Sequence, residues 1–542
     1  MRDSPATQTC ADLLISCLEA NGVTAAFGVP GEETTELVSA IDRSGIDFVL
    51  CRHEQSAAFM ASVHGRLTGN PALCIATLGP GATNLVTGVA DATLDHVPMI
   101  AITGQGARDQ LGRESHQIID LESLFVPITK FSRTLVLADE IPQVVAEAAR
   151  HCNADKPGAV HLSLPEDLAG VPTTAEPFVA SPPAETRPAT DAVVRAARLV
   201  SQSKEPVILA GHGVIRANAA ELVRDLSEKL SAPVLTTFMA KGILAPDHPL
   251  CLHTIGQPGE ELASKAFELS DLVIAIGFDP VEYPPAKVTL SGMRPVLEIS
   301  DVASTVDVNW PVKAALTGDL LQSIGALHKA TAQRELQTAF EDLRRKINET
   351  LEQGATTSKG KCLTPSDICK EISNTLRDSD VLLSGVGLHK LWIARNVQAK
   401  RAGQIIIPNG LAGMGLALPG AIEAARQLET GRVIAVCGDG DFLMNVQEME
   451  TATRLCVPVT VLVWEDNGYG LIDEKQPGDR EFAFRNPDWA SLAQAFGWVY
   501  HDIDTPAKLG PALQAAADIA VPTLLRVPVD YAAEGGMPAA RD

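Results

Sequence analysis

Aromatic residues are scarce in this chain of 542 residues, where phenylalanine, tryptophan and tyrosine together make up 4%. Hydrophobic residues nevertheless reach 46%. The core must therefore consist mainly of alanine, valine, leucine and isoleucine, a composition that favours buried parallel sheets covered by helices. The chain is too long for a single core, and its length predicts about three or four domains.

Positive charge is also in short supply, and the formal net charge is −23. Nucleic acids and anionic membranes would both repel such a chain, so we expect neither as a partner. The repulsion does not exclude small anions, because helix N-termini or a bound metal ion can hold them locally.

Long apolar runs and regularly spaced cysteines are missing as well. Apolar stretches such as Val433–Cys437 have the length of a strand and cannot span a bilayer. The N-terminal residues lack a basic segment followed by an apolar run, so we expect no signal peptide. The ten cysteines are scattered from Cys10 to Cys456 without metal-ligand spacing, which indicates reduced thiols. These absences predict a soluble cytoplasmic protein.

Two stretches without apolar periodicity, residues 170–190 and 352–360, divide the sequence into three segments. Within each segment, short β-rich runs alternate with longer helical patterns, which predicts parallel sheets with helices on both faces. We therefore expect three doubly wound α/β domains, at residues 1–170, 190–335 and 360–532, of which the first and third could be distant relatives. The expected strands are Ala72–Leu78, Met99–Thr103, Pro206–Ala210, Pro233–Thr236, Leu272–Ile276, Val381–Ser384, Gln404–Ile407, Val433–Cys437 and Val459–Trp464.

Two acidic turns stand one strand–helix–strand unit apart in the third segment. Asp439 lies between Gly438 and Gly440 after one buried strand, and Asp466 follows the next strand. Both emerge at the carboxyl ends of parallel strands, where ligands of open α/β sheets bind. Two carboxylates and the carbonyl of Gly468 would supply the oxygen ligands that Mg²⁺ prefers beside phosphate oxygens. Asp-Gly alone is a common turn, so the pair carries this prediction.

A nucleotide-binding enzyme is the alternative interpretation of these glycine turns. The strings at 438–440 and 79–81 both lack the third glycine of the dinucleotide fingerprint, and the chain has no GxxxxGK[ST] loop. Because these features are missing, the sequence favours neither a dinucleotide-binding nor a nucleotide-triphosphate-binding enzyme.

Glu54 opens an apolar helix of small residues in the first segment. An acid in the first turn is ordinarily explained by the helix dipole alone. The string RHEQSAAFMA at 52–61, however, resembles the segment that carries the catalytic glutamate of thiamine-diphosphate enzymes. Further strings resemble acetolactate synthase-like members of that family, in the same order. They are FGVPG at 27–31, GPGATN at 79–84, HQ at 116–117, VGLH at 386–389, NGLAGMG at 409–415, and the GDG and EDNGY turns.

The resemblance covers roughly residues 11–531 and implies thiamine diphosphate and Mg²⁺ as cofactors. Glu54 would hydrogen-bond N1′ of the aminopyrimidine and favour the imino tautomer that removes the C2 proton. Met414 would wedge between the two rings and bring that nitrogen to C2. Gln117 and His389 would orient substrate or relay protons, although His116-Gln117 could equally start a helix.

The implied cofactor-binding residues are Pro30, Gly31, Glu54, Thr77, Gly79, Asn84, Gly387, His389, Gly413, Met414, Gly438, Asp439, Gly440, Asp466, Gly468 and Tyr469. The implied metal ligands are Asp439, Asp466 and Gly468. Asp466 departs from the asparagine of most members but keeps an oxygen ligand. The resemblance also implies a homodimer or homotetramer with active sites at subunit interfaces.

The reaction is predicted from smaller differences within the family. Biosynthetic members carry a tryptophan that favours 2-oxobutyrate, where this chain has Lys475, and their central-domain arginine is absent from IGFDPVEY at 276–283. That string and Gln257-Pro258-Gly259 resemble the catabolic, FAD-independent acetolactate synthases. We therefore expect two pyruvates to give 2-acetolactate and CO₂, with FAD possible but not favoured. The alternatives are another thiamine-diphosphate decarboxylase or carboligase, using for example an aldehyde or sulfoacetaldehyde, and a catalytically silent paralogue.

Overall fold

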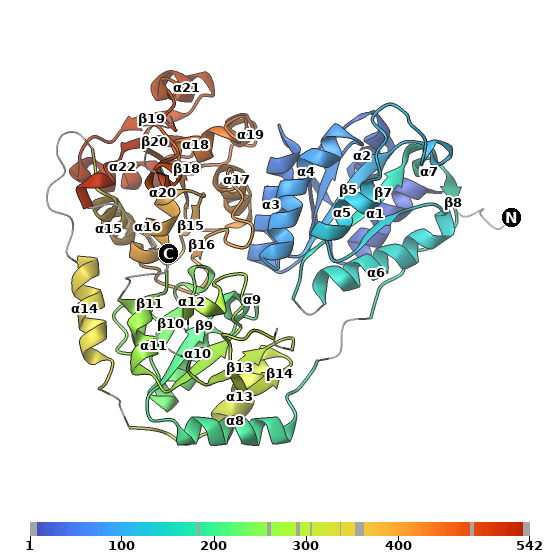
Figure 1. The fold of residues 1–542 in the computed structure, drawn as a ribbon. Coiled ribbons are helices and arrows are strands. Elements are labelled where there is room, and N and C mark those ends of the chain that lie inside the picture. The colour runs from blue at the N-terminus through green and yellow to red at the C-terminus, as the bar shows by residue number, and fades with distance from the viewer. Residues whose placement is uncertain are drawn as a thin grey trace. The chain divides into compact units, whose positions relative to one another are not determined.

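Three six-stranded sheets form the framework of the protein, and all neighbouring strands within each are parallel. The computed structural model describes residues 8–154, 156–181, 185–256, 262–288, 293–303, 306–335, 338–352, 362–476 and 482–534. Helices flank each sheet, which confirms the expected class of three α/β parallel-sheet domains (Figure 1).

The chain divides into two compact units. The first contains residues up to 184 together with 410–427 and 445–457, and the second contains the remainder. The limits expected for the three domains stay a prediction, because this division follows packing rather than chain order.

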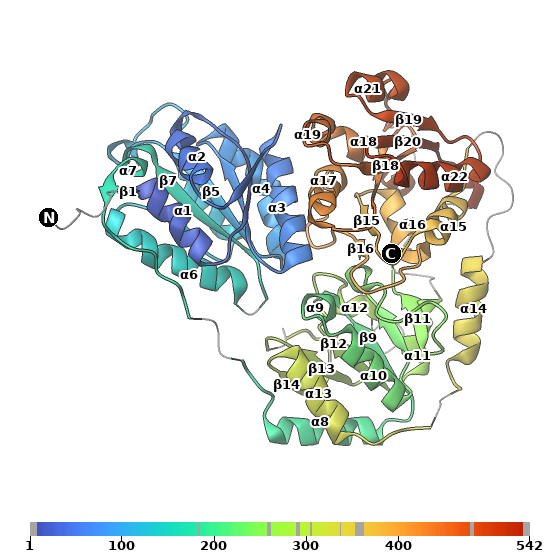
Figure 2. The ribbon, with the colours of Figure 1, turned by 180° about the vertical axis from the view of Figure 1, so that it is seen from behind.

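The sheet of the first unit has the order β3-β2-β4-β5-β7-β6. Its strands are β2 (Ala25–Val29), β3 (Asp47–Leu50), β4 (Ala72–Ala76), β5 (Met99–Gln105), β6 (Ser132–Thr134) and β7 (Ala159–Pro165). Its helices are α1 (Cys10–Ala20), α2 (Thr35–Asp42), α3 (Glu54–Thr68), α4 (Pro80–Leu94), α5 (Leu121–Phe125), α6 (Ile141–Asn153) and α7 (Glu166–Ala169). Helices α1, α2 and α6 share a core with one face, and α3 and α4 pack on the other (Figure 2). A short antiparallel pair joins β1 (Gln8–Thr9) to β8 (Pro172–Thr173).

Two helices from much later in the chain complete the first unit. They are α17 (Ala417–Gln427) and α19 (Glu448–Arg454). Helix α17 packs along α3, where His64 Nδ1 lies 2.9 Å from the Glu423 carboxylate and both side chains are buried. This contact explains why α3 is buried on nearly all sides despite lying at the outer face of its own sheet.

The central sheet of the second unit has the order β11-β10-β9-β12-β13-β14. Its strands are β9 (Pro206–Ala210), β10 (Val234–Thr236), β11 (Cys251–Thr254), β12 (Leu272–Ile276), β13 (Val296–Ser300) and β14 (Val312–Thr317). Its helices are α8 (Thr190–Gln202), α9 (His212–Arg216), α10 (Ala220–Leu230), α11 (Ala266–Leu269), α12 (Pro285–Val288), α13 (Leu320–Ala330) and α14 (Glu341–Glu352). One face packs against α8, α10 and α13, and the other against α11, α12 and α14.

The third sheet, also in the second unit, has the order β16-β15-β17-β18-β20-β19. Its strands are β15 (Val381–Ser384), β16 (Ile405–Ile406), β17 (Val433–Gly438), β18 (Val459–Glu465), β19 (Val499–Asp502) and β20 (Thr523–Pro528). Its helices are α15 (Pro365–Thr375), α16 (Leu388–Asn396), α18 (Asp439–Leu443), α20 (Gly470–Lys475), α21 (Trp489–Ala495) and α22 (Pro506–Ala517). Counted from its first strand, this sheet repeats the strand order of the first sheet, whereas the central sheet does not. In both, the order reverses between the first and third strands, which creates a switch point for ligands.

Two observations bear on the expected cellular setting. No helix in the described part of the chain is long and apolar enough to cross a membrane. All ten cysteines are described, and all are free thiols.

Candidate active site

Glu54 is the first residue of α3, directly after the turn that leaves β3. His53 caps the helix, with Nδ1 accepting a hydrogen bond from the backbone N–H of Gln55 at 3.0 Å. The Glu54 side chain is buried, and Oε2 accepts a hydrogen bond from Nδ2 of Asn84 at 3.0 Å. Asn84 is the only residue in the described part of the chain that hydrogen-bonds this carboxylate. Oε1 is therefore left to bind a ligand atom, as the expected contact with N1′ requires.

The turns after β2 and β4 meet at the switch point of the first sheet. A Cβ atom added to Gly31, which follows Pro30, would lie 2.4 Å from Cβ of Thr77. Gly79 has φ +51° and caps α4, and a Cβ atom there would lie 2.7 Å from the backbone oxygen of Gln117. Both positions favour glycine, because an added side chain would overlap the Thr77 side chain at Gly31 and the Gln117 backbone at Gly79.

Replacing Gly31 with alanine is expected to destabilise the protein by about 1–3 kcal/mol, because the added methyl group overlaps Thr77 and forces the two turns apart. Urea unfolding measures the effect. Gly170→Ala is the matched control, since nothing lies within 4 Å of the added atom. Equal stability of the two variants would show that the turns are not in contact.

The structure contradicts one of the two interpretations of Gln117, namely that it starts a helix. Its φ is +58°, its side chain is exposed, and α5 begins only at Leu121. The pair His116-Gln117 therefore does not start a helix. The backbone of Gln117 lies beside Gly79, and a substrate role for its side chain stays a prediction.

The segment that carries Met414 belongs to the first unit and lies against α3 and α4. The carbonyl of Met414 accepts a hydrogen bond from Nε2 of Gln55, the neighbour of Glu54, at 3.1 Å. The backbone N–H of Gly413 donates to Asp91 Oδ1 at 3.3 Å, and a Cβ atom on Gly413 would lie 3.1 Å from the ring of Phe59. The structure thus brings together Glu54, Asn84 and Met414 around the first turn of α3.

Glu448 supports this turn and was not expected from the sequence. Its Oε1 accepts a hydrogen bond from the backbone N–H of Arg52, two residues before Glu54, at 3.0 Å. Burial raises the pKa of the Glu448 carboxyl. Only tertiary packing reveals this residue, because no sequence pattern links α19 to a turn 396 positions earlier.

His389 lies in the second unit, in the first turn of α16 beside the switch point of the third sheet. A Cβ atom on Gly387 or on Gly438 would lie 3.1 Å from its ring. Burial, and then the charge of Lys390, lower the pKa of His389 to about 3, so the ring is neutral. Its Nε2 is buried and has no hydrogen-bond partner among the described residues. An unpaired polar atom at a glycine-lined switch point fits a polar ligand.

Asp439 and Asp466 leave the ends of β17 and β18. The carboxylate of Asp439 accepts hydrogen bonds at 2.8 Å from the backbone N–H groups of Gly440 and Asn467. Burial raises the pKa of Asp439, and burial followed by the charge of Asp439 raises the pKa of Asp466 to about 7. A buried and a half-buried carboxylate that repel each other are stabilised by a divalent cation, so this donor set fits Mg²⁺.

A metal site made of side chains alone is not present in the part of the chain that the structure describes. There, no group of three or more histidine, cysteine, aspartate or glutamate residues could hold a metal ion. The expected set differs, because its third protein ligand is the carbonyl of Gly468. That set stays a prediction.

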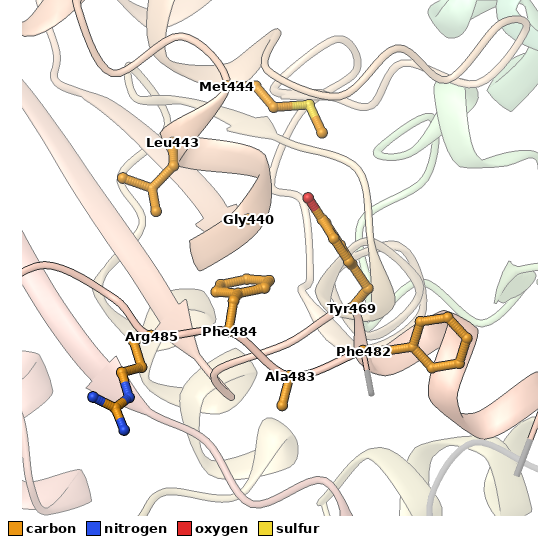
Figure 3. A pocket seen from close by; sticks show the side chains of 8 residues that line it. All are labelled: Gly440, Leu443, Met444, Tyr469, Phe482, Ala483, Phe484 and Arg485. Carbon is orange, nitrogen blue, oxygen red and sulfur yellow. The ribbon is translucent and has the colours of Figure 1, made fainter. Parts of the chain in front are cut away.

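A pocket adjoins these turns, and its lining residues are Gly440, Leu443, Met444, Tyr469, Phe482, Ala483, Phe484 and Arg485 (Figure 3). The rings of Tyr469 and Phe484 pack edge to face, with 5.2 Å between the ring centroids. A Cβ atom on Gly440 would lie 2.8 Å from Tyr469 and 3.2 Å from Phe484. Gly440 therefore lets two aromatic rings approach the backbone of the expected metal turn.

The switch point of the central sheet is filled by a side chain of the protein. Glu282 accepts hydrogen bonds from the backbone N–H of His212, at 2.9 Å, and from Oγ1 of Thr237, at 2.5 Å. Gly211 and Gly277 pack closely beside it, since a Cβ atom on Gly211 would lie 2.5 Å from the Gly277 oxygen. Nearby, Gln257-Pro258-Gly259 lies outside the described residues, and Lys475 ends α20 as an exposed side chain.

Comparison with known proteins defines the class first. Three models of thiamine pyrophosphate enzymes match the chain: the N-terminal TPP binding domain at residues 8–124, the central domain at 193–327 and the C-terminal TPP binding domain at 385–527. With three parallel sheets in this order, the chain is a thiamine pyrophosphate enzyme.

The similarity to individual relatives identifies the family within this class more specifically. The chain is 33% identical to "Acetolactate synthase" of Bacillus subtilis (strain 168) over 96% of this chain and 93% of that protein. It is 31% identical to "Acetolactate synthase, catabolic" of Raoultella terrigena, over 96% and 95% of the two chains. It is 30% identical to "Acetolactate synthase isozyme 1 large subunit" of Escherichia coli (strain K12), over 96% and 94%. The protein therefore belongs to the acetolactate synthase-like family of thiamine-pyrophosphate-dependent enzymes.

Proposed function

We propose that this enzyme decarboxylates pyruvate and joins the two-carbon unit to a second pyruvate, giving 2-acetolactate and CO₂. The observation that carries the proposal is the buried Glu54 carboxylate, held by Asn84 beside Met414, in a chain that resembles acetolactate synthases along nearly its whole length. The paired carboxylates Asp439 and Asp466 support it, because they provide the anionic half of a cofactor site.

Each residue of the proposed site has a separate task. Thiamine diphosphate, when bound, supplies a nucleophilic carbon and accepts the electrons left when CO₂ departs. Glu54 holds a proton between Oε1 and the aminopyrimidine, while Asn84 fixes its second oxygen. Asp439, Asp466 and the Gly468 carbonyl would hold Mg²⁺, which would neutralise the charge of the diphosphate. Met414 would pack between the two rings of the cofactor, and the neutral His389 would accept a hydrogen bond through Nε2 at the switch point.

FAD is not part of the proposed reaction. In an open α/β sheet a dinucleotide places its pyrophosphate at the switch point, close to backbone N–H groups. Glu282 already occupies that position and satisfies the N–H of His212. The negative charge of Glu282 would repel a pyrophosphate. We therefore propose that the central domain binds no flavin.

The remaining parts of the proposal concern assembly and compartment. We propose a homodimer or homotetramer with active sites at subunit interfaces, as the resemblance of the sequence strings to acetolactate synthase-like enzymes implies. A cytoplasmic setting is supported by the ten free thiols, because oxidising compartments favour disulfides.

Product analysis tests the proposed reaction. Purified protein with thiamine diphosphate, Mg²⁺ and pyruvate is expected to form acetolactate and CO₂, at a rate that added FAD does not change. Acetaldehyde as the main product would instead assign the enzyme to the decarboxylases. Bound thiamine diphosphate without pyruvate turnover would point to another donor or acceptor, and failure to bind the cofactor would contradict the entire proposal.

A further inference from the structure

The segment Phe482–Asn486 lies directly beside residues 466–469, the turn expected to bind the metal ion. No motif in the sequence points to this segment. It pairs with the turn through one isolated antiparallel bridge, with Gly468 opposite Ala483. The backbone N–H of Tyr469 donates to the Phe482 carbonyl at 3.1 Å, and that of Phe484 donates to the Asn467 carbonyl at 2.9 Å. These two bonds fix the peptide groups on both sides of Gly468.

Asn486 ends this segment and reaches the carboxylate of Asp439. Its Nδ2 lies 2.8 Å from Asp439 Oδ2, 3.2 Å from Glu465 Oε1 and 3.2 Å from Asn467 Oδ1. An amide nitrogen carries two hydrogens, so the shortest contact, to Asp439, takes one and the other two acceptors share the second. Asn486 thus donates a hydrogen bond to the Asp439 carboxylate from a neutral side chain.

Glu465 holds Asn486 in place because it is itself anchored. Its Oε1 accepts a hydrogen bond from Nε1 of Trp489 at 2.6 Å, and its Oε2 pairs with Arg526 at 2.5 Å. Arg526 is further held by Asp502 at 2.8 Å. The Glu465 side chain is largely buried, whereas Arg526 and Asp502 are partly exposed.

We propose that Asn486 is a positioning residue that orients the Asp439 carboxylate for a divalent cation, while Phe482–Phe484 hold the Gly468 carbonyl toward the same ion. The inference rests on the metal site of the proposed function. A neutral donor suits this task, because it restrains one carboxylate oxygen without adding charge beside two carboxylates that already repel each other. Phe484 assists by packing its ring against Tyr469 and Gly440 (Figure 3).

Binding of Mn²⁺, followed by electron paramagnetic resonance in the presence of thiamine diphosphate, tests the inference without relying on turnover. Asn486→Ala and Asn486→Leu are expected to weaken Mn²⁺ binding by about 10–100-fold, the usual effect of removing a residue that orients a metal ligand. Leucine keeps approximately the volume of the side chain but removes the amide donor, so it separates the loss of the hydrogen bonds from the loss of packing. Asn153→Ala is the control, because Asn153 is the last residue of α6 in the first unit and its Nδ2 donates to the Ala149 carbonyl.

The possible outcomes distinguish a failure of the role of Asn486 from a failure of the proposed metal site. Wild-type affinity in both Asn486 variants, with Mn²⁺ bound by the wild type, would overturn the role of Asn486 alone. A wild-type protein that binds thiamine diphosphate but no Mn²⁺ would overturn the proposed metal site, and this inference with it. Weak Mn²⁺ binding accompanied by an unchanged unfolding temperature of the metal-free variants is the expected result, since a merely structural role would lower that temperature instead.

Discussion

Replacing Glu54 with glutamine is expected to lower acetolactate formation by about 10²–10⁴-fold, the usual contribution of a positioned proton-transfer group. Glutamine keeps the size of the side chain and can still contact Asn84, but it cannot hold the exchangeable proton of a carboxyl group. The loss should therefore fall on kcat, with binding of thiamine diphosphate nearly unchanged. Steady-state rates of product formation, together with calorimetric titration of the cofactor, measure the two quantities separately.

Glu36→Gln is the matched control for this experiment. Glu36 also lies in the first turn of a helix of the first unit, but its side chain is exposed. Its replacement should leave the rate within about twofold of wild type, as expected of a surface substitution. Activity above about a tenth of wild type in Glu54→Gln would falsify the catalytic assignment of this residue, because one proton-transfer group contributes more than that.

Replacing Asp439 with asparagine is expected to weaken Mg²⁺ binding by more than about 100-fold, beyond the range for residues that only orient a ligand. The change removes a charged oxygen ligand and leaves a single side-chain oxygen, which can accept from the N–H of Gly440 or from that of Asn467 but not from both. Because Mg²⁺ carries the diphosphate, affinity for thiamine diphosphate at low Mg²⁺ should fall in parallel. Titration of the cofactor at several Mg²⁺ concentrations measures both effects.

Recovery at high Mg²⁺ distinguishes a lost ligand from a damaged fold. Partial recovery of thiamine diphosphate binding is expected for Asp439→Asn, since mass action compensates a weakened site. Asp473→Asn serves as the control, because Asp473 is exposed on α20 close by. The assignment is wrong if Asp439→Asn and Asp473→Asn need the same Mg²⁺ concentration.

Local sequence signals predicted much of the fold. The strands Pro206–Ala210, Leu272–Ile276 and Val381–Ser384 coincide with β9, β12 and β15 to the residue. Other expected strands differ by one or two residues at an end, where pairing with a neighbour rather than the local composition decides the boundary. The edge strand β16 is the clearest case, because it pairs only with β15 and keeps two residues.

The candidate site could be predicted only where its residues stand in short, continuous strings. Glu54, Asp439 and Asp466 each sit at a strand-to-helix turn whose glycines and apolar neighbours are visible in sequence. Asn486 and Glu448 could not be found this way, since each acts through hydrogen bonds to residues of other elements. Glu282 stands in the string at 276–283, but its hydrogen bond to the N–H of His212 is visible only in the folded chain. The composition breaks likewise gave no sign that residues 410–427 pack in the first unit, because that packing depends on contacts across the chain.

The late arrival of α17 and α19 has a consequence for how the protein is made. The N–H of Arg52 has its hydrogen-bond acceptor, Glu448, 396 residues later in the chain. At ribosomal speeds of about 5–20 residues per second, Glu448 is synthesised roughly 20–80 s after Arg52. During that interval the first sheet can form, but the face of α3 that α17 covers stays open to water and to other chains. Nascent chains stalled between the end of the first sheet and α17 should therefore be the species that chaperones bind.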